Sequence, residues 1–324
     1  MTKAIRIHET GGPEVLAYED VEVGAPGPGE ALLHQTAVGL NFIDIYYRLG
    51  LYPIPSMPVT LGVEAAGTVE AVGDGVSDIQ PGDRVAYAPV LGAYAGRRLI
   101  AADRLVKLPD DVSANEAAAM MLQGLTAQYL GRRCYRIAAA DTVLVHAAAG
   151  GVGLILCQWA KHLGATVIGT VGSEAKAELA RRHGCDHVIN YTEEDFVERV
   201  AEITGGEGLP VVYDSVGKTT FMKSLDCLRP FGLMVSFGQS SGPVEPLDLK
   251  HLAAKGSLHL TRPTLMTYAA KRADLLAGAK ELFEVVGSGA VTVQRNQEYA
   301  LADTAEAHRD LESRKTTGST ILIP

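Results

Sequence analysis

The chain of 324 residues lacks several features that would place it in a specialised class. Its four cysteines are scattered without a C-x-x-C pair, which excludes a disulfide framework and a zinc knuckle and predicts buried thiols in a reducing cytosol. A basic excess is also missing: 29 Lys and Arg stand against 38 Asp and Glu, for a net charge of −9. Because an acidic surface repels phosphate backbones, we expect no nucleic-acid partner.

Targeting and membrane signals are absent as well. The longest uncharged apolar run lies between Asp141 and Lys161 and has three glycines near its middle, which is unlike a membrane span. Charged residues appear within Met1–Glu9, before any long apolar stretch, so the N-terminus does not read as a signal peptide. We therefore expect a cytoplasmic protein with no membrane partner.

The composition is that of an ordinary globular protein, with 47% hydrophobic and 21% charged residues. Its length predicts two domains. In the first 110 or so residues, Gly/Pro turns separate short β-like runs such as Ala31–Val38, Ala65–Val72 and Arg84–Tyr87. This spacing favours an antiparallel, barrel-like domain. The period then changes, and Asn115–Leu130 is predicted to be helical.

From Asp141 onward, apolar strands alternate with helical segments. Thr142–Val145 and Thr166–Val171 are predicted strands, and the helices Gly151–Leu163 and Glu174–His183 follow them, each ended by a glycine. Uniformly apolar strands alternating with helices predict a parallel sheet covered on both faces, a Rossmann-type doubly wound α/β domain. Later expected elements are strand cores at Val188–Ile189, Val211–Tyr213, Met234–Phe237, Leu258–Thr261 and Ser319–Ile323, and helices at Leu225–Leu228, Lys271–Val286 and Thr304–Leu311. The last strand suggests that the C-terminus rejoins the first domain.

The segment Val143–Gly153, VLVHAAAGGVG, is the most informative motif. Against the dinucleotide pattern G-x-G-x-x-G, the matching positions are Ala148, Gly150 and Gly153, so alanine replaces the first glycine. The predicted strand before the turn and the helix after it are both present, which favours a pyrophosphate site over an ordinary tight turn.

The end of the second strand favours NADPH over NADH. An NAD site usually has an acid there, but this strand runs into Gly172 and Ser173, and no acid occurs before Glu174. Small polar residues with Lys176 one turn later suit a 2′-phosphate. Arg181 and Arg182, further along the helix, read as a solvated face.

The stretch Asp141–Lys161 resembles the signature of the zeta-crystallin-like quinone oxidoreductases, in the zinc-independent branch of the medium-chain dehydrogenase/reductase superfamily. Ala140 at the first signature position is a minor departure. Further matches run along the chain at Gly11–Leu16, Asn41–Asp44, Gly50–Pro53, Gly82–Val85, Tyr213–Gly217 and Phe237–Gly238. The ordered series makes the resemblance specific.

The resemblance implies an architecture and an assembly. It implies a GroES-like, mainly β catalytic domain built from residues 1–123 and 265–324, and a Rossmann NADPH-binding domain at 124–264. It also implies a homodimer, for which Leu258–Thr261, read as an edge strand, is the candidate contact.

Site residues are likewise implied by position. The residues that correspond to Asn41, Tyr46 and Tyr52 line the nicotinamide and substrate side, although core packing is the alternative for both tyrosines. Cofactor-binding positions are Thr126, Tyr129, Ala149, Gly150, Gly151, Val152, Gly172, Ser173, Lys176, Tyr191, Phe237, Gly238, Ser240, Arg262, Thr264 and Arg314. Phenols can stack on flat rings, and arginines pair with phosphates.

No metal is expected. Zinc-dependent relatives have a cysteine where this chain has Asn41, and a His-Glu pair where it has Val63 and Glu64. Without thiolate and imidazole, a tetrahedral zinc site does not form. Glu64 is then expected to be a buried structural acid, and His146 a packed strand histidine. Nucleophile motifs such as G-x-S-x-G are also missing.

The sequence thus favours NADPH-dependent reduction of a small-molecule quinone without a metal. Reduction of activated C=C bonds in enones or 2-alkenals stays open, because both reactions deliver hydride to a conjugated acceptor. A non-catalytic NADPH-binding protein is the third possibility. RNA binding, linked to some related proteins, is disfavoured by the net charge and by the lack of a basic patch with interleaved aromatics.

Overall fold

The computed structural model describes residues 1–324, which form two compact units. The first unit comprises Met1–Leu125, Ala269–Phe283 and Val293–Pro324, and the second comprises Thr126–Tyr268 and Glu284–Thr292. Residues 284–292 thus belong to the second unit, whereas the sequence-based division groups them with the catalytic domain. One reason is that the Thr292 N–H donates to Gln158 Oε1 at 2.9 Å, and Gln158 Nε2 donates to the Thr292 carbonyl at 3.1 Å.

The second unit is built on a six-stranded parallel sheet. The strand order is β11 (His187–Asn190), β10 (Thr166–Val171), β9 (Thr142–Val145), β12 (Leu209–Asp214), β13 (Leu228–Ser236) and β14 (His259–Thr261). Every residue of β12 is buried, as expected for a strand covered on both faces. The predicted doubly wound sheet is confirmed, with β14 at one edge.

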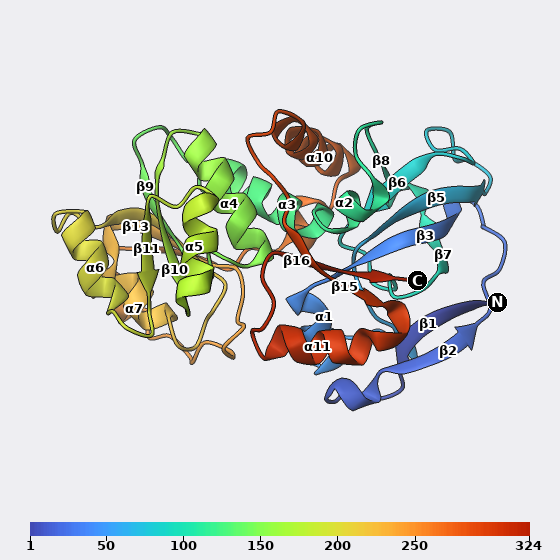
Figure 1. The fold of residues 1–324 in the computed structure, drawn as a ribbon, viewed down its shortest axis with the longest axis horizontal. Coiled ribbons are helices and arrows are strands. Elements are labelled where there is room, and N and C mark those ends of the chain that lie inside the picture. The colour runs from blue at the N-terminus through green and yellow to red at the C-terminus, as the bar shows by residue number, and fades with distance from the viewer. The chain divides into compact units, whose positions relative to one another are not determined.

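Helices cover both faces of this sheet (Figure 1), with α4 (Gly151–His162) and α5 (Glu174–Arg182) on one face and α6 (Phe196–Ile203) and α7 (Phe221–Asp226) on the other. Gly164 and Gly184, with φ of 91° and 94°, follow the ends of α4 and α5. The predicted helix Leu225–Leu228 is wrong at its end, because Leu228 pairs with Leu209 as the first residue of β13. Two short helices, α8 (Lys250–Ala254) and α9 (Leu265–Tyr268), complete the unit.

The first unit contains a larger and a smaller sheet. The larger sheet has the order β15 (Arg295–Ala300), β16 (Ser319–Ile323), β3 (Glu30–Leu40), β5 (Ala65–Val72), β6 (Arg84–Tyr87) and β8 (Val106–Lys107), with β7 (Arg97–Ala101) also paired to β3. The smaller sheet is β2 (Ala17–Val21), β1 (Thr2–Ile7) and β4 (Val59–Thr60). All pairs are antiparallel except β15 with β16. Because β16 pairs with β3, the C-terminal strand rejoins the first unit, as predicted.

The helices of the first unit are few and mostly short. They are α1 (Phe42–Arg48), α2 (Ala114–Ala118) and α11 (Thr304–Glu312), with 3₁₀ turns η1 (Pro13–Val15), η2 (Ala102–Arg104) and η4 (Leu301–Asp303). The division between the units falls within α3 (Met121–Tyr129) and within the 16-residue α10 (Arg272–Gly287), and a π-helical turn η3 (Leu130–Cys134) follows α3. The predicted single helix Asn115–Leu130 is therefore interrupted. At the start of α3, the Leu122 N–H donates to the buried Glu64 carboxyl group at 2.7 Å.

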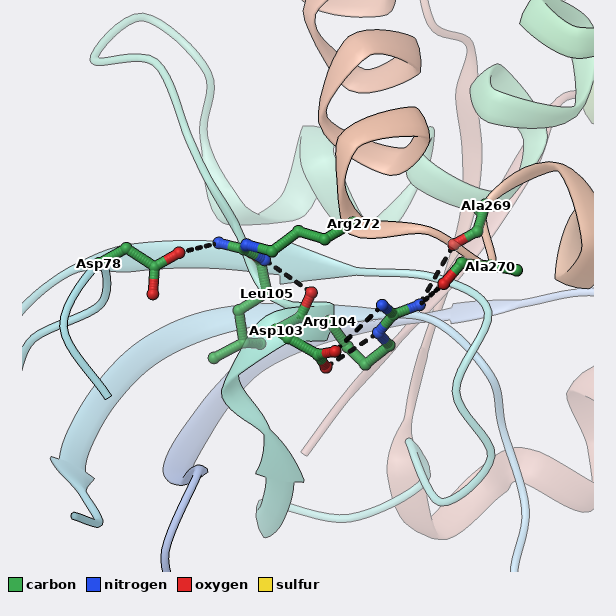
Figure 2. Close-up of polar contacts among 7 residues, drawn as sticks. All are labelled: Asp78, Asp103, Arg104, Leu105, Ala269, Ala270 and Arg272. Atoms are coloured by element: carbon green, nitrogen blue, oxygen red, sulfur yellow. Dashed lines mark hydrogen bonds and ion pairs between the residues drawn. The ribbon is translucent and has the colours of Figure 1, made fainter. Parts of the chain in front are cut away.

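Two arginines fasten the start of α10 to the first unit (Figure 2). Arg272 Nη1 donates to the carbonyls of Asp103 at 2.6 Å and Leu105 at 3.1 Å, and Nη2 pairs with Asp78. Arg104 Nη1 donates in turn to the carbonyls of Ala269 and Ala270, both at 3.1 Å. The segment before α10 and its first turn are thus tied to η2 by charge-assisted bonds to backbone carbonyls. No helix of the structure is long and apolar enough to cross a bilayer.

Candidate functional site

The turn between β9 and α4 holds the glycines of the predicted nucleotide motif. Gly150 is the N-cap of α4, and no side chain caps the helix. The N–H groups of a first helical turn have no acceptor within the helix, so this end offers backbone donors of the kind that bind phosphate. At Gly153, a Cβ would lie 2.3 Å from the Ala147 carbonyl oxygen. Gly153 therefore permits the close packing of helix on turn that dinucleotide sites require.

A second group of predicted residues meets at the carboxyl end of β10. Ser173 caps α5, and its Oγ accepts the Lys176 N–H at 3.4 Å. A Cβ on Gly172 would lie 2.5 Å from the Tyr191 hydroxyl, so this phenol lies against the glycine. The first acid after the strand, Glu174, is paired with Arg181 at 2.8 Å. Hydroxyls and a lysine therefore stand where an NAD site places its carboxylate.

The third group follows β13 and β14. Gly238 packs on the loop after β12, since a Cβ there would lie 2.6 Å from the Ser215 carbonyl oxygen. Ser240 lies in the same loop after β13, and its N–H donates to the Ser215 carbonyl at 3.1 Å. Arg262, just after β14, donates from Nη1 to the Ser236 carbonyl at 2.8 Å, beside Phe237. Thr264 follows two residues later and is exposed.

Two predicted residues lie on α3, before the sheet begins. Thr126 is buried, with 9% of its surface exposed, and Tyr129 is 2% exposed. The Tyr129 ring stacks on Tyr268 at 4.4 Å with an interplanar angle of 9°, and the Arg133 guanidinium lies 5.1 Å from the centre of the Tyr268 ring. The Tyr129 ring is thus held in an aromatic stack of its own unit.

The second unit therefore brings most predicted cofactor residues to the carboxyl ends of its strands. These are Ala149, Gly150, Gly151, Val152, Gly172, Ser173, Lys176, Tyr191, Phe237, Gly238, Ser240 and Arg262. The carboxyl edge of a parallel sheet is where such folds bind ligands. Arg314 belongs to the first unit, where it follows α11 in a left-handed conformation with φ of 60°, and the structure does not place it with this group.

In the first unit, Asn41 is the N-cap of α1 and is buried. Its N–H donates to Asp44 Oδ2 at 2.8 Å, and its Nδ2 donates to Glu64 Oε2 at 2.7 Å. Burial raises the pKa of Glu64 to about 8, against the opposing effect of its bonds from Leu122 and Asn41. The expectation that Glu64 is a buried acid is thus confirmed, and it lies in direct contact with Asn41.

Two further residues, which the sequence patterns did not single out, continue this contact. Gln123 Nε2 donates to Asn41 Oδ1 at 3.1 Å, and Ser319 Oγ donates to Gln123 Oε1 at 2.6 Å. Both side chains are buried. No local signal could have revealed them, because Gln123 and Ser319 are 196 positions apart in the chain. For Gln123, the only hint was an amide side chain within a largely apolar helical segment.

Tyr46 and Tyr52 also come together. Tyr46 lies on α1 and is 8% exposed, and its ring centre is 5.5 Å from that of Tyr52. Tyr47 meets Tyr52 edge-on, also at 5.5 Å. Tyr52 and Tyr47 are both partly exposed, so these two members of the cluster have surface available for another flat ring.

The far end of α1 is held by a second buried network. Asp44 Oδ2 accepts from the Tyr94 hydroxyl at 2.9 Å, and that hydroxyl lies 3.1 Å from His308 Nε2. Arg48 contacts His308 Nδ1 at 2.9 Å and Glu312 at 2.7 Å. Burial raises the pKa of Asp44 to about 7, while burial and then Arg48 lower the pKa of His308 to about 3. The helix that carries Asn41 and Tyr46 is thus fixed at both ends by polar contacts.

No group of three or more His, Cys, Asp or Glu side chains in the structure could hold a metal ion. Around Glu64, the neighbours are an amide and backbone N–H groups rather than thiolates or imidazoles. His146 is buried and packed, as predicted, although it lies in the turn directly after β9 rather than in the strand. Its ring nitrogens contact Thr170 Oγ1 at 2.8 Å and Ser224 Oγ at 2.9 Å. Burial lowers its pKa.

Comparisons with known proteins agree with the fold. Residues 27–130 match the family described as alcohol dehydrogenase GroES-like domain, and residues 151–289 match the zinc-binding dehydrogenase family. A quinone oxidoreductase of Pseudomonas aeruginosa is 53% identical over the full length of both chains. The chain belongs to the quinone oxidoreductases of the medium-chain dehydrogenase/reductase superfamily.

Two other relatives bear on the cofactor and the substrate. The crystal structure of the Escherichia coli quinone oxidoreductase complexed with NADPH has a TM-score of 0.98 and 51% identity, covering 99% of this chain and 100% of that one. A 2-haloacrylate reductase of a Burkholderia species is 47% identical, over 100% of this chain and 99% of its own length. As a member of this family the chain is an oxidoreductase, and its Rossmann and GroES-like fold is confirmed.

Proposed function

We propose that the chain reduces quinones with NADPH and uses no metal ion, as a member of the zeta-crystallin-like branch. NADPH, when bound, supplies the hydride. The observation that carries the proposal is the pair of neighbouring groups at the carboxyl ends of β9 and β10. The uncapped start of α4 offers donors to a pyrophosphate, and Ser173, Lys176 and Tyr191 offer a cation and hydroxyls to a 2′-phosphate.

The roles in the first unit follow from the contacts of each side chain. Tyr52 offers a partly exposed ring and hydroxyl to a flat acceptor, and Tyr46 packs behind it. Asn41, fixed through Glu64 and Gln123, offers an amide for orienting a carbonyl. We propose that these residues orient the quinone and that a tyrosine hydroxyl or water provides the proton, since a quinone needs little acid assistance.

The direct test follows NADPH oxidation by the purified protein with 1,4-benzoquinone and a 2-alkenal as parallel acceptors, with and without chelator. We expect faster turnover with the quinone and no effect of chelation. Loss of activity in chelator would contradict the metal-free proposal, and tight NADPH binding without turnover of either acceptor would revive a purely binding role.

Reduction of an activated C=C bond is the second candidate. The 47% identity with a 2-haloacrylate reductase over the whole chain favours it specifically. A preference for the alkenal would leave the fold and the cofactor unchanged and would move the substrate class to conjugated alkenes.

The proposal extends to a cytoplasmic homodimer. Four free cysteines fit a reducing compartment. Strand β14 pairs with β13 alone, so its outer edge is available for a second copy. A monomeric mass in light scattering at micromolar concentration would contradict the dimer.

A further inference from the structure

Four buried polar side chains in the first unit form one directed hydrogen-bond chain. Ser319 donates to Gln123 Oε1 at 2.6 Å, Gln123 donates from Nε2 to Asn41 Oδ1 at 3.1 Å, and Asn41 donates from Nδ2 to Glu64 Oε2 at 2.7 Å. These hydrogen bonds link β16, α3 and the start of α1 to the Glu64 carboxyl group, which precedes β5. Each amide accepts through oxygen on one side and donates through nitrogen on the other.

The direction of this chain fixes the orientation of both amides. If the Asn41 amide turned over alone, its oxygen would face Glu64 Oε2 and its nitrogen would face Gln123 Nε2. Two amide NH₂ groups would then meet at the Gln123 contact, each a buried donor without an acceptor, which is costly. Asn41 can therefore reverse only if Gln123 reverses with it.

Both ends of this hydrogen-bond network are anchored. At one end, Glu64 Oε1 accepts the Leu122 N–H at 2.7 Å, and Gly39 makes room for the carboxyl group, since a Cβ there would lie 2.2 Å from Glu64 Oε2. At the other end, Ser319 is buried at the start of β16, the strand that pairs with β3. Gln123 is thus held by Ser319 and contacts Asn41 from the side opposite Glu64.

We propose that Gln123, backed by Ser319, is a positioning residue for quinone reduction that holds the Asn41 amide in one orientation. The inference rests on the proposed function, in which Asn41 orients the acceptor. With Gln123 in place, Asn41 keeps its NH₂ group toward Glu64 and its oxygen toward Gln123. Without that donor, the amide samples both orientations, and an acceptor aligned by one of them is misaligned by the other.

The sharpest test is Gln123→Glu, which keeps the size and shape of the side chain. An ionised carboxylate at this position cannot donate to Asn41 Oδ1, whereas a protonated one can donate there and still accept from Ser319. We expect kcat/KM for 1,4-benzoquinone, relative to the unmodified protein, to be about 10–100-fold lower at pH 8 and to recover toward pH 6. Asp44 and Glu64, the buried carboxyls on the neighbouring elements, are present in both proteins, so the ratio removes their common contribution to the pH profile.

Gln35→Glu is the matched control. Gln35 is a buried glutamine of the same unit that donates to the Ala93 carbonyl at 2.8 Å, and no hydrogen bond connects it with Asn41. We expect its kcat/KM ratio to be flat with pH. A flat ratio for Gln123→Glu, or the same slope in both variants, would overturn the proposal.

Two further measurements separate possible failures. If Gln123→Glu does not fold, Gln123→Met, which has no donor at any pH, should lower kcat/KM by a similar factor at every pH while the Kd for NADPH, read by fluorescence, stays unchanged. An unchanged kcat/KM in Gln123→Met overturns the inference. Absence of quinone turnover in the unmodified protein would instead contradict the proposed function itself.

Discussion

In the second unit the buried carboxyl group of Asp214 is satisfied by residues within ten positions of the chain, whereas the buried carboxyl group of Glu64 in the first unit depends on more distant segments. Asp214 accepts from the N–H groups of Val216 and Gly217 and from two hydroxyls within ten positions along the chain. Glu64 accepts from Asn41 and Leu122, which are 23 and 58 positions away. Arg48 reaches 260 positions to His308.

This difference shows how each unit is stabilised. The sheet of the second unit is stabilised by buried apolar strands and helices, and the polar contacts around Asp214 are local. In the first unit, ionisable side chains are buried, and Glu64, Asp44 and Arg48 each contact a residue from a distant part of the chain. Removing one partner there leaves another group buried and unpaired, so we expect single substitutions to have larger effects.

The largest effect should come from Arg48→Met. The Arg48 side chain is 1% exposed and is the buried cation between His308 and Glu312. Its loss should lower the free energy of unfolding by about 3–5 kcal/mol, as measured by urea denaturation. Arg48→Lys, which keeps the charge but loses the forked geometry, should retain part of this stability. Equal stabilities for Arg48→Met and the unmodified protein would remove the basis of the comparison.

A smaller, functional effect is expected in the second unit with Lys176→Ala. If Lys176 makes a charge-assisted bond to the 2′-phosphate, its loss should raise the ratio of the KM for NADPH to the KM for NADH. The expected increase corresponds to about 1.5–3 kcal/mol. The fold should be unaffected, because the site of the second unit is local. Arg181→Ala on the same helix is the control, since Arg181 pairs with Glu174. Equal effects on the KM values of both cofactors would show that Lys176 does not bind the 2′-phosphate.

The same contrast explains what the sequence could predict. Strands β9 and β10 and the glycine turn were located residue by residue, because periodicity and glycine placement are local signals. Helix α6 and strands β1, β2 and β15 were missed because each is short, with five to eight residues. Asn41 was reached through resemblance, whereas its partners Gln123 and Ser319 depend on contacts between segments that no local pattern encodes.

The pH dependence of stability offers a third test. The pKa of Glu64 is raised by burial from 4.5 to about 8, so between these values the folded state binds more protons than the unfolded state. This contribution to stability is fully present below pH 4.5 and is lost as the pH rises through 8. Relative to the unmodified protein, Glu64→Gln should gain up to about 1.4 kcal/mol per pH unit between pH 5 and 8, measured by urea unfolding at each pH.

Comparing Glu64→Gln with the unmodified protein makes this test specific. Asp44, whose pKa burial raises to about 7, acts in the same direction, and His308, whose pKa is lowered to about 3, acts in the opposite one. Both residues remain in Glu64→Gln, so the difference between the two proteins isolates Glu64. Parallel stability curves would mean that Glu64 is ionised throughout this range.

The smallest effect should follow Asp78→Ala, an exposed counterpart to the buried charges of the first unit. The Asp78 side chain is 55% exposed and pairs with Arg272 at the start of α10. An ion pair in solvent contributes about 0–1 kcal/mol, and Arg272 would keep its bonds to the carbonyls of Asp103 and Leu105 (Figure 2). We therefore expect a loss of unfolding free energy below about 1 kcal/mol that shrinks further in high salt. A loss as large as that of Arg48→Met would show that burial is not what separates the strong polar contacts of this unit from the weak ones.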